Sequence, residues 1–244
     1  MLRPWHQIPI SASKDPLVEI PFRLLRLEPH PYLSLGAPYA NGSSPWRLRS
    51  KVIDRLFLAQ DLLKNTNSEL QLAIFDAWRP LAVQKFMVEY SIQRECLNQA
   101  ISFSDSNYSS KYQEIVDQVQ KFWAPPSTNP LTPPPHSTGA AIDITLATSN
   151  GLPIDMGGAI DEIGDISMPN HYSQSAKTNP NSISATWHSR RLLLHEMMSS
   201  AGFVQHPNEW WHFSYGDQLW AWKNNSANAF YGSLSFSDSN SIIF

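Results

Sequence analysis

The chain has 244 residues, of which 42% are hydrophobic and 16% charged, and its formal net charge is −3. This composition is typical of an ordered globular protein and excludes a disordered or fibrous chain. Because no cluster of Lys and Arg accompanies the small net charge, neither nucleic acid nor an anionic membrane is expected as a partner, and small-molecule or peptide chemistry is favoured.

No segment of the sequence predicts export or membrane insertion. Residues 1–17 lack the continuous apolar run of a signal peptide, and no uncharged apolar run approaches the roughly 20 residues that span a bilayer. We therefore expect a soluble, cytoplasmic protein. Since no flexible linker separates two patterned halves, a single domain over residues 1–244 is expected.

The first half of the chain predicts a helix, a strand and a second helix. Residues 3–39 are rich in proline and indicate extended segments, and apolar residues at spacings of three and four then predict a helix over 52–65. In "ELQLAIFDAWRP" (69–80) alternation predicts a strand that carries the chain into Asp76 and Arg79. Pro80 suits the first position of the next helix.

The second half predicts two more helices and two strands. A helix is expected over 111–123, ended by the proline-rich stretch 124–135, and a strand is expected within "HSTGAAIDITL" (136–146). Residues 164–182 are typical of a long surface loop. A helix over 186–200 with Gly202 as its C-terminal cap, a strand "EWWHFSY" (209–215) and a Ser/Asn-rich tail follow.

His136 and Asp143 lie seven positions apart, across a glycine turn and the start of that strand. Because side chains alternate along a strand, Ile142 and Ile144 would face the core while Asp143 faces a cleft. The turn at 137–139 can fold His136 over the same face, so both side chains could bind one metal ion. Taken alone, the pair also fits a turn histidine and a solvated carboxylate.

Glu209 and His212 lie three positions apart beside two tryptophans. Positions three apart on an ideal strand face opposite ways, so joint action requires a bulge or a strand end. Neutral imidazole is a good zinc ligand, and a neighbouring carboxylate can take a proton from metal-bound water. The alternative is an amphipathic strand with packed tryptophans and solvated polar residues.

Three further residues bear on this chemistry. Arg79 would follow a strand, where it could form a structural ion pair with Asp76 or bind the oxyanion of an acyl transfer. Cys96 is the only cysteine, so any metal must be held by His, Asp or Glu. The stretch "LHEMMSS" begins like a zinc-binding helix, but Ser199 stands where the second histidine would be.

The stretches "FDAWRP", "HSTGAAIDITL", "MGGAIDE" and "EWWHFSYGD" together resemble the zinc D-alanyl-D-alanine dipeptidases of the vancomycin-resistance type, in peptidase family M15. The resemblance covers about residues 20–225 and leaves a tail at about 224–244. It implies an α+β fold with a central, mainly antiparallel sheet flanked by helices, as in the Hedgehog-like D,D-peptidases. It also implies one zinc ion per chain and hydrolysis of D-alanyl-D-alanine or a similar D,D-dipeptide in cell-wall metabolism.

Carried over by position, the resemblance makes His136, Asp143 and His212 the zinc ligands and Glu209 the general base and acid. Two histidines and one aspartate would leave a fourth zinc position open for water. Glu209 would take a proton from that water and return it to the leaving amine.

The substrate contacts are also implied by the resemblance. Arg79 would stabilise the transition state, Asp161 would receive the free amino group of the substrate, and Tyr32 would line the same pocket. Pro134 departs from the family, which has a serine there, so the preference among dipeptides stays open. Trp78, where tyrosine is usual, is a smaller departure.

Two other functions remain in view. A carboxypeptidase or endopeptidase acting on cell-wall peptides would use the same zinc chemistry with an open groove. A zinc-dependent binding module without activity is the other, although retention of Glu209 and Arg79 argues against it. The sequence leaves open whether the chain forms a homo-oligomer and whether its role is resistance, wall recycling or nutrient use.

Overall fold

The protein is described by a computed structural model that covers residues 3–11, 13–40, 43–101 and 110–234. The strands are β1 (Leu17–Glu19), β2 (Leu25–Arg26), β3 (Arg47–Arg49), β4 (Leu70–Asp76), β5 (Ala141–Thr148), β6 (Val204–Gln205) and β7 (His212–Ser214). The α-helices are α1 (Pro31–Ser34), α2 (Ser50–Thr66), α3 (Leu81–Asn98), α4 (Ser110–Phe122), α5 (Ser173–Thr178), α6 (Ile183–Ser200) and α7 (Gln218–Lys223). The 3-10 helices are η1 (Pro4–Gln7), η4 (Pro135–Thr138) and η5 (Asp165–Ser167).

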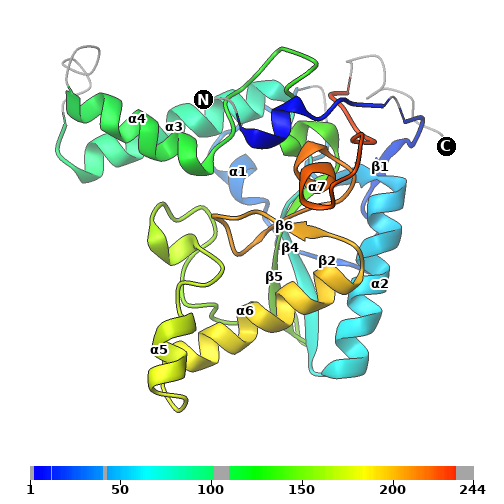
Figure 1. Ribbon diagram of the computed structural model, residues 1–244, viewed down its shortest axis with the longest axis vertical. Helices are drawn as coiled ribbons and strands as arrows, with labels where there is room; N and C mark the ends of the chain where they lie inside the picture. Colours follow the sequence, from blue (N-terminus) through cyan, green and yellow to red (C-terminus); the bar gives the residue numbers. More distant parts are fainter. Residues whose placement is uncertain (1–2, 12, 41–42, 102–109, 235–244) are drawn as a thin grey trace.

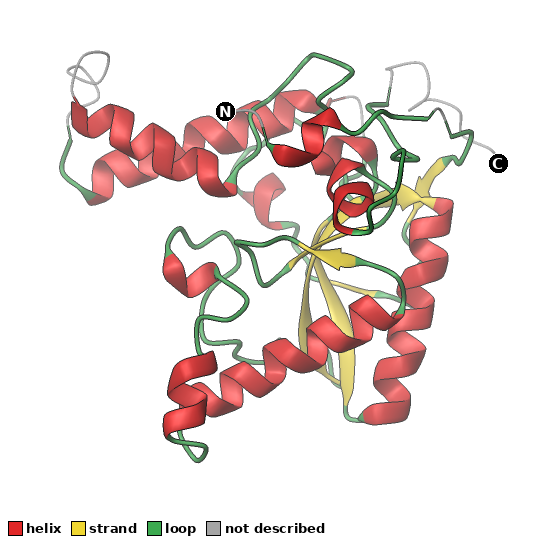
Figure 2. Cartoon of the chain, viewed as in Figure 1, coloured by secondary structure: helices red, strands yellow, loops and turns green. Residues whose placement is uncertain are grey.

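A five-stranded sheet in the order β2-β4-β5-β7-β6 forms the centre of the described structure (Figure 1, Figure 2). Strands β2 and β4 are parallel, and the remaining neighbours in the sheet are antiparallel. A separate antiparallel pair joins β1 to β3. Helices flank the central sheet, which confirms the predicted α+β fold with a mainly antiparallel sheet.

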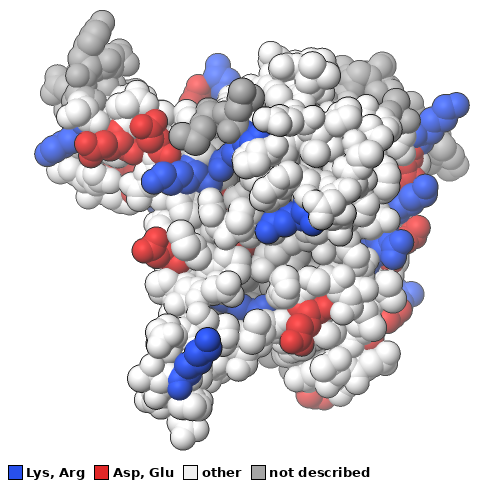
Figure 3. Space-filling view, in the orientation of Figure 1, with Lys and Arg blue, Asp and Glu red and all other residues white. Residues whose placement is uncertain are grey.

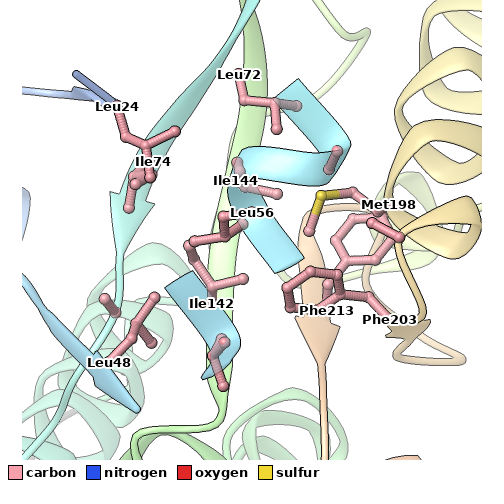
Figure 4. Packing of buried hydrophobic residues seen from close by; sticks show 14 of the residues in the cluster. Leu24, Leu48, Leu56, Leu72, Ile74, Ile142, Ile144, Met198, Phe203 and Phe213 are labelled. Carbon is pink, nitrogen blue, oxygen red and sulfur yellow. The ribbon is translucent and has the colours of Figure 1, made fainter. Parts of the chain in front are cut away.

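Helices α2 and α6 cover one face of the sheet and enclose the main apolar core (Figure 4). Ile142 and Ile144 of β5 point into this core beside Leu56 of α2 and Met198 of α6, and all four side chains are fully buried. The predicted alternation along β5 is therefore confirmed. Because neighbouring side chains alternate, Asp143 points to the opposite face.

Helices α3 and α4 lie side by side at the top of Figure 1 and form a second apolar cluster. Val83 and Met87 of α3 pack there with Ile115 and Val119 of α4. Trp123, directly after α4, completes the cluster and is 4% exposed. This pair of helices therefore brings Trp123 close to Arg79, which follows strand β4.

Several predicted elements are confirmed with shifted ends. The helices expected over 52–65 and 111–123 are α2 and α4, and Gly202 follows α6 with a φ of 93°, as a C-terminal cap requires. Helix α6 begins at Ile183, before the expected residue 186, because the Ser182 side chain accepts a hydrogen bond from the Ala185 amide. Pro80 is the N-cap of α3, one position before the expected place.

Two expectations differ from the structure in kind. Residues 164–182 are not a loop throughout, since they contain η5 and α5. The strand expected over 209–215 is reduced to β7, because residues 206–211 form the connection from β6.

Packing also extends beyond the expected core of residues 20–225. Trp5 is 6% exposed, and Tyr231 is 2% exposed and donates to Asp15 at 2.7 Å. Of the predicted tail, residues 235–244 lie outside the described residues, and a single domain over 1–244 stays a prediction.

The surface charge and the length of the helices bear on the expected lack of a basic cluster and of a membrane-spanning segment. On the face in Figure 3, charged side chains of the described residues stand in small separate groups of both signs. Within the described ranges, no helix is long and apolar enough to cross a membrane.

We expect the Leu146→Ala substitution to lower the free energy of unfolding by about 2–5 kcal/mol, because Leu146 is 0% exposed in the main core and its loss leaves a cavity. Urea unfolding at equilibrium measures the change. The matched control is Leu97→Ala, since Leu97 is 79% exposed and should change stability by about 0.5 kcal/mol or less. Equal losses in both variants would contradict this account of the core.

Candidate metal centre

His136, Asp143 and His212 meet on the face of the sheet opposite the main core. Each offers one ligand atom, and these atoms all lie within 4.8 Å of one another. Asp143 of β5 is paired directly with His212 of β7, so the register of the sheet sets two of the three side by side. All three are buried, with exposed fractions of 3%, 1% and 5%.

A glycine turn brings the third residue to the other two. His136 lies in η4, which ends at Gly139 with a left-handed φ of 72°. The Gly139 amide donates to the His136 carbonyl at 3.2 Å, and a Cβ at this glycine would lie 2.6 Å from Leu17 Cδ1. The left-handed φ therefore favours glycine, and a Cβ would also require the flexible end of Leu17 to move. The turn expected at 137–139 is confirmed.

Hydrogen bonds fix which ring nitrogens face the centre. His136 Nδ1 lies 2.6 Å from the Ala77 carbonyl, so it donates there and leaves Nε2 as an acceptor. His212 Nε2 lies 3.4 Å from Ser214 Oγ, which donates to Asp217 at 2.7 Å. The remaining nitrogens, His136 Nε2 and His212 Nδ1, face each other at 3.1 Å.

This arrangement fits a zinc ion. Two imidazole lone pairs 3.1 Å apart repel each other unless a cation or a proton lies between them, and Asp143 Oδ1 lies 3.1 Å from His212 Nδ1. Zinc is commonly held by nitrogen and carboxylate ligands whose second ring nitrogen donates to a carbonyl or to a hydrogen-bonded chain. His136 and His212 both have such an outer partner.

Arg79 bridges two carboxylates beside this centre. Its Nε donates to Asp76 Oδ2 at 2.6 Å and its Nη2 to Asp143 Oδ2 at 2.6 Å. The expected ion pair with Asp76 is therefore confirmed, and the same side chain also reaches the candidate ligands. Although burial disfavours the charged form, His136, His212 and Arg79 hold the pKa of Asp143 well below its usual range, so Asp143 stays an anion.

Glu209 lies outside the strands, three residues before the start of β7, so the opposed facing of positions three apart on one strand does not apply to Glu209 and His212. It belongs to the connection between β6 and β7, with Oε2 3.7 Å from His212 Nδ1 and Oε1 3.3 Å from His206 Nδ1. Burial, together with the negative charges of Asp143 and Asp161, raises the pKa of Glu209 well above its usual range. Such a carboxyl group is suited to proton transfer near neutral pH.

Asp161 stands on a loop with a left-handed φ of 66° and accepts a hydrogen bond from the Tyr32 hydroxyl at 2.8 Å. Burial and the negative charge of Asp143 raise the pKa of Asp161 to about 7. Tyr32 is only 1% exposed and also accepts from Arg79 at 3.2 Å. Tyr32 therefore supports Asp161 from behind, and a direct contact of Tyr32 with substrate stays a prediction.

Arg191 of α6 holds the loop that carries Asp161. Its guanidinium donates to the carbonyls of Met156 at 2.8 Å, Ile166 at 2.9 Å and Met168 at 3.1 Å. These carbonyls lie on both sides of Asp161 in the sequence, so one buried arginine fixes both arms of the loop.

One cavity of about 250 Å³ joins these side chains. Its walls include the candidate metal ligands with Arg79, Asp161 and Glu209, the Pro133–Pro135 stretch, Trp123 and the N-terminal segment. The structure thus brings together every residue predicted for the site, with Tyr32 directly behind the wall. Pro134 lies on the wall without a hydroxyl or an amide N–H to offer.

Acidic groups outnumber arginines around the cavity. The acidic side chains in or directly behind its wall are those of Asp76, Asp143, Asp161 and Glu209. Among the described lining residues, the arginines are Arg3 and Arg79. Burying unbalanced negative charge is costly, so the site favours a divalent cation and a positively charged group on its ligand.

Sequence reasoning missed some of these residues. His206 lies three positions before Glu209, so the regular spacing of His206, Glu209 and His212 carried a signal. Burial, followed by the nearby His212, lowers the pKa of His206 well below its usual range and keeps it neutral. Arg3 and Trp123 belong to no motif, and only the fold brings them to the site.

Comparisons with known proteins place the chain among peptidases. A family model described as D-ala-D-ala dipeptidase, of peptidase family M15, matches residues 26–230. A D-alanyl-D-alanine dipeptidase of Synechocystis is 43% identical over 95% of this chain and 96% of its own length. A D-alanyl-D-alanine dipeptidase of Escherichia coli is 32% identical over 60% of this chain and 55% of its own length. A solved structure titled VanYB in complex with D-alanine-D-alanine aligns with a TM-score of 0.44 at 16% identity, over 88% of this chain and 85% of its own.

We expect the purified protein to hold about one zinc ion per chain, as three protein ligands allow. The His136→Ala, Asp143→Ala and His212→Ala substitutions should each weaken zinc binding by more than the roughly 10- to 100-fold cost of losing an outer partner. Metal content after competition with a chelator measures this. His195→Ala, whose ring contacts Gln205 at 3.0 Å, is the matched control and should keep zinc. Full occupancy in His212→Ala would refute the ligand set.

Proposed function

The chain belongs to the D-ala-D-ala dipeptidase family of the M15 peptidases, and from that premise we propose that it is a zinc dipeptidase acting on D-alanyl-D-alanine or a similar D,D-dipeptide. The observation that carries the proposal is the convergence of His136, Asp143 and His212 beside Glu209 on the wall of one cavity. A cavity of about 250 Å³ suits a small substrate better than a long peptide.

His136, Asp143 and His212 are the proposed zinc ligands. A zinc ion bound there would lower the pKa of water towards about 7 and polarise the carbonyl of the substrate. The two histidines contribute neutral nitrogens and Asp143 contributes a negative charge, which suits a divalent cation while leaving part of the charge uncompensated for catalysis.

Glu209 is the proposed general base and acid. Its carboxyl group lines the cavity beside His212 and has a raised pKa, so it can accept a proton from the attacking water. The same group then donates that proton to the amine that leaves. His206, which is neutral and 3.3 Å away, supports Glu209 without competing for the proton.

Arg79 is proposed to stabilise negative charge on the carbonyl oxygen of the scissile bond. Its guanidinium is held by Asp76, and Nη1 donates to Gln84 at 3.3 Å, so its orientation is set before substrate binds. Since Arg79 also donates to Asp143, its loss would disturb a proposed ligand as well as the transition state.

Asp161 is proposed to bind the amino group of the dipeptide. Its carboxyl group lines the cavity, and the Tyr32 hydroxyl and the Arg191-bound loop fix its position. A free ammonium group would supply positive charge where acidic groups are in excess. An N-blocked peptide lacks that charge, so it should bind poorly.

The location of the protein in the cell and the metabolic role of the reaction are part of the proposal. We place it in the cytoplasm and in cell-wall metabolism, as the sequence led us to expect. Cell fractionation with an antibody to the protein tests the first, and sedimentation tests whether it forms a homo-oligomer.

We expect the Glu209→Gln protein to keep its zinc and its fold but to lose about 10²- to 10⁴-fold in kcat for D-alanyl-D-alanine, the cost of removing a general base. Glu196→Gln, an exposed position on α6, is the control and should keep wild-type activity. Wild-type turnover in Glu209→Gln would refute the proposed role. If the zinc-loaded wild type cleaved no dipeptide, a binding module would be the better account.

A second comparison tests the amino-group site. The Asp161→Asn protein should lose roughly 10- to 100-fold in kcat/KM for free D-alanyl-D-alanine, as expected for a hydrogen bond to a charged group. The loss in kcat/KM should be much smaller for the N-acetylated dipeptide. The difference in kcat/KM between the two substrates should therefore be smaller in the Asp161→Asn protein than in the wild type. Asp165→Asn, an exposed position nearby, is the control. Comparable cleavage of both substrates by the wild type would favour a carboxypeptidase.

A further inference from the structure

The N-terminal segment, residues 3–7, forms one wall of the cavity although it precedes the residues 26–230 that the family model matches. Arg3, Trp5 and His6 line the cavity from this segment. Part of the cavity wall is therefore built by residues that lie outside the matched region.

Trp5 anchors this segment. It is 6% exposed, and its ring lies 5.8 Å from His206 and 5.7 Å from Trp222, measured between ring centroids. The following residues are also bound, since Gln218 donates to the Ile8 carbonyl at 2.7 Å. The segment is a fixed part of the site.

Arg3 presents unused donors to the cavity. Its Nη2 donates to the carbonyls of Gln120 and Lys121, at the end of α4, which holds the guanidinium in place. No described residue accepts a hydrogen bond from its Nε or Nη1, and none of the described carboxylates forms an ion pair with it. Arg79, by contrast, is bound to two carboxylates.

Arg3 and Asp161 are held at different parts of the cavity wall. Arg3 is bound at the end of α4, where the Lys121 carbonyl also accepts from Asn208 in the connection that carries Glu209. Asp161 is bound to Tyr32 of α1.

We propose that Arg3 binds the C-terminal carboxylate of the dipeptide and so contributes to selecting the acid over the C-terminal amide. This inference rests on the proposed function, in which Asp161 takes the amino group. A buried carboxylate is costly unless it is paired, and the other groups on these walls include three acidic side chains. The Nε and Nη1 donors of Arg3, which no described residue accepts, point to different sides of the guanidinium, so either can give a carboxylate one charge-assisted hydrogen bond.

The test compares D-alanyl-D-alanine with its C-terminal amide, which lacks the negative charge. For the acid, the Arg3→Gln protein should lose roughly 10- to 100-fold in kcat/KM, the range for a charge-assisted hydrogen bond. For the amide, the loss should be within about threefold by the same reasoning. Arg3→Lys should recover part of the activity on the acid, and Arg23→Gln, at an exposed arginine paired with Asp61, should behave as the wild type.

A binding measurement keeps the test independent of turnover. Calorimetry on the zinc-loaded Glu209→Gln protein, with and without Arg3→Gln, should show weaker binding of the acid and unchanged binding of the amide. Equal losses for acid and amide, by either method, would show that Arg3 only holds the segment and would overturn the proposal, as would no loss at all. A wild type that binds both ligands with this difference but cleaves neither would refute the proposed function and leave the Arg3 inference standing.

Discussion

Two carboxylates that face each other across neighbouring strands set the conditions for the rest of the site. A register shift in β4 between Ile74 and Asp76 places Asp76 opposite Asp143 of β5. Like charges at directly opposed positions repel, and both side chains are buried. Arg79 bridges them with bonds of 2.6 Å to each, so the bulge, the arginine and the two acids form a unit. His30, 3.0 Å from Asp76, completes it.

This unit orients the proposed metal ligands before any metal is bound. Asp143 keeps one oxygen on Arg79 and turns the other towards His212. The carbonyl of Ala77, three residues before Pro80, fixes the His136 ring, and Ser214 with Asp217 fixes that of His212. These buried hydrogen bonds therefore hold the three proposed metal ligands around one point. In the proposed function, a cation and a charged substrate neutralise the excess negative charge of the site.

Local patterns in the sequence predicted most of the helices and strands, whereas the resemblance to a known family was needed to assign the residues of the proposed site. Alternation along β5 predicted that Asp143 faces away from Ile142 and Ile144. The spacing of Glu209 from His212 required a bulge or a strand end for joint action, and in the structure Glu209 lies in the connection before β7. The pattern could not place Arg3 or Trp5, because their contacts with α4, His206 and Trp222 join positions far apart in the sequence. The family resemblance, and not a local pattern, indicated Tyr32, and the position of its ring behind Asp161 depends on how α1 packs. The extent of β7 was overestimated, since apolar and aromatic residues in a tight connection resemble a strand.

The loop bearing Asp161 is held by helix α6 through Arg191, and the start of the same connection is hydrogen-bonded to β5, where the Ile154 amide donates to the Leu146 carbonyl. Arg3 likewise sits on a segment held by α4 and α7. In the proposed function, the metal ligands Asp143 and His212 lie in the sheet, whereas Asp161 and Arg3, the proposed contacts of the two ends of the substrate, lie on segments attached to it. On this proposal, exchange of the 157–168 loop or of the first residues would change which peptide termini are accepted and would leave the strands that carry Asp143 and His212 unaltered.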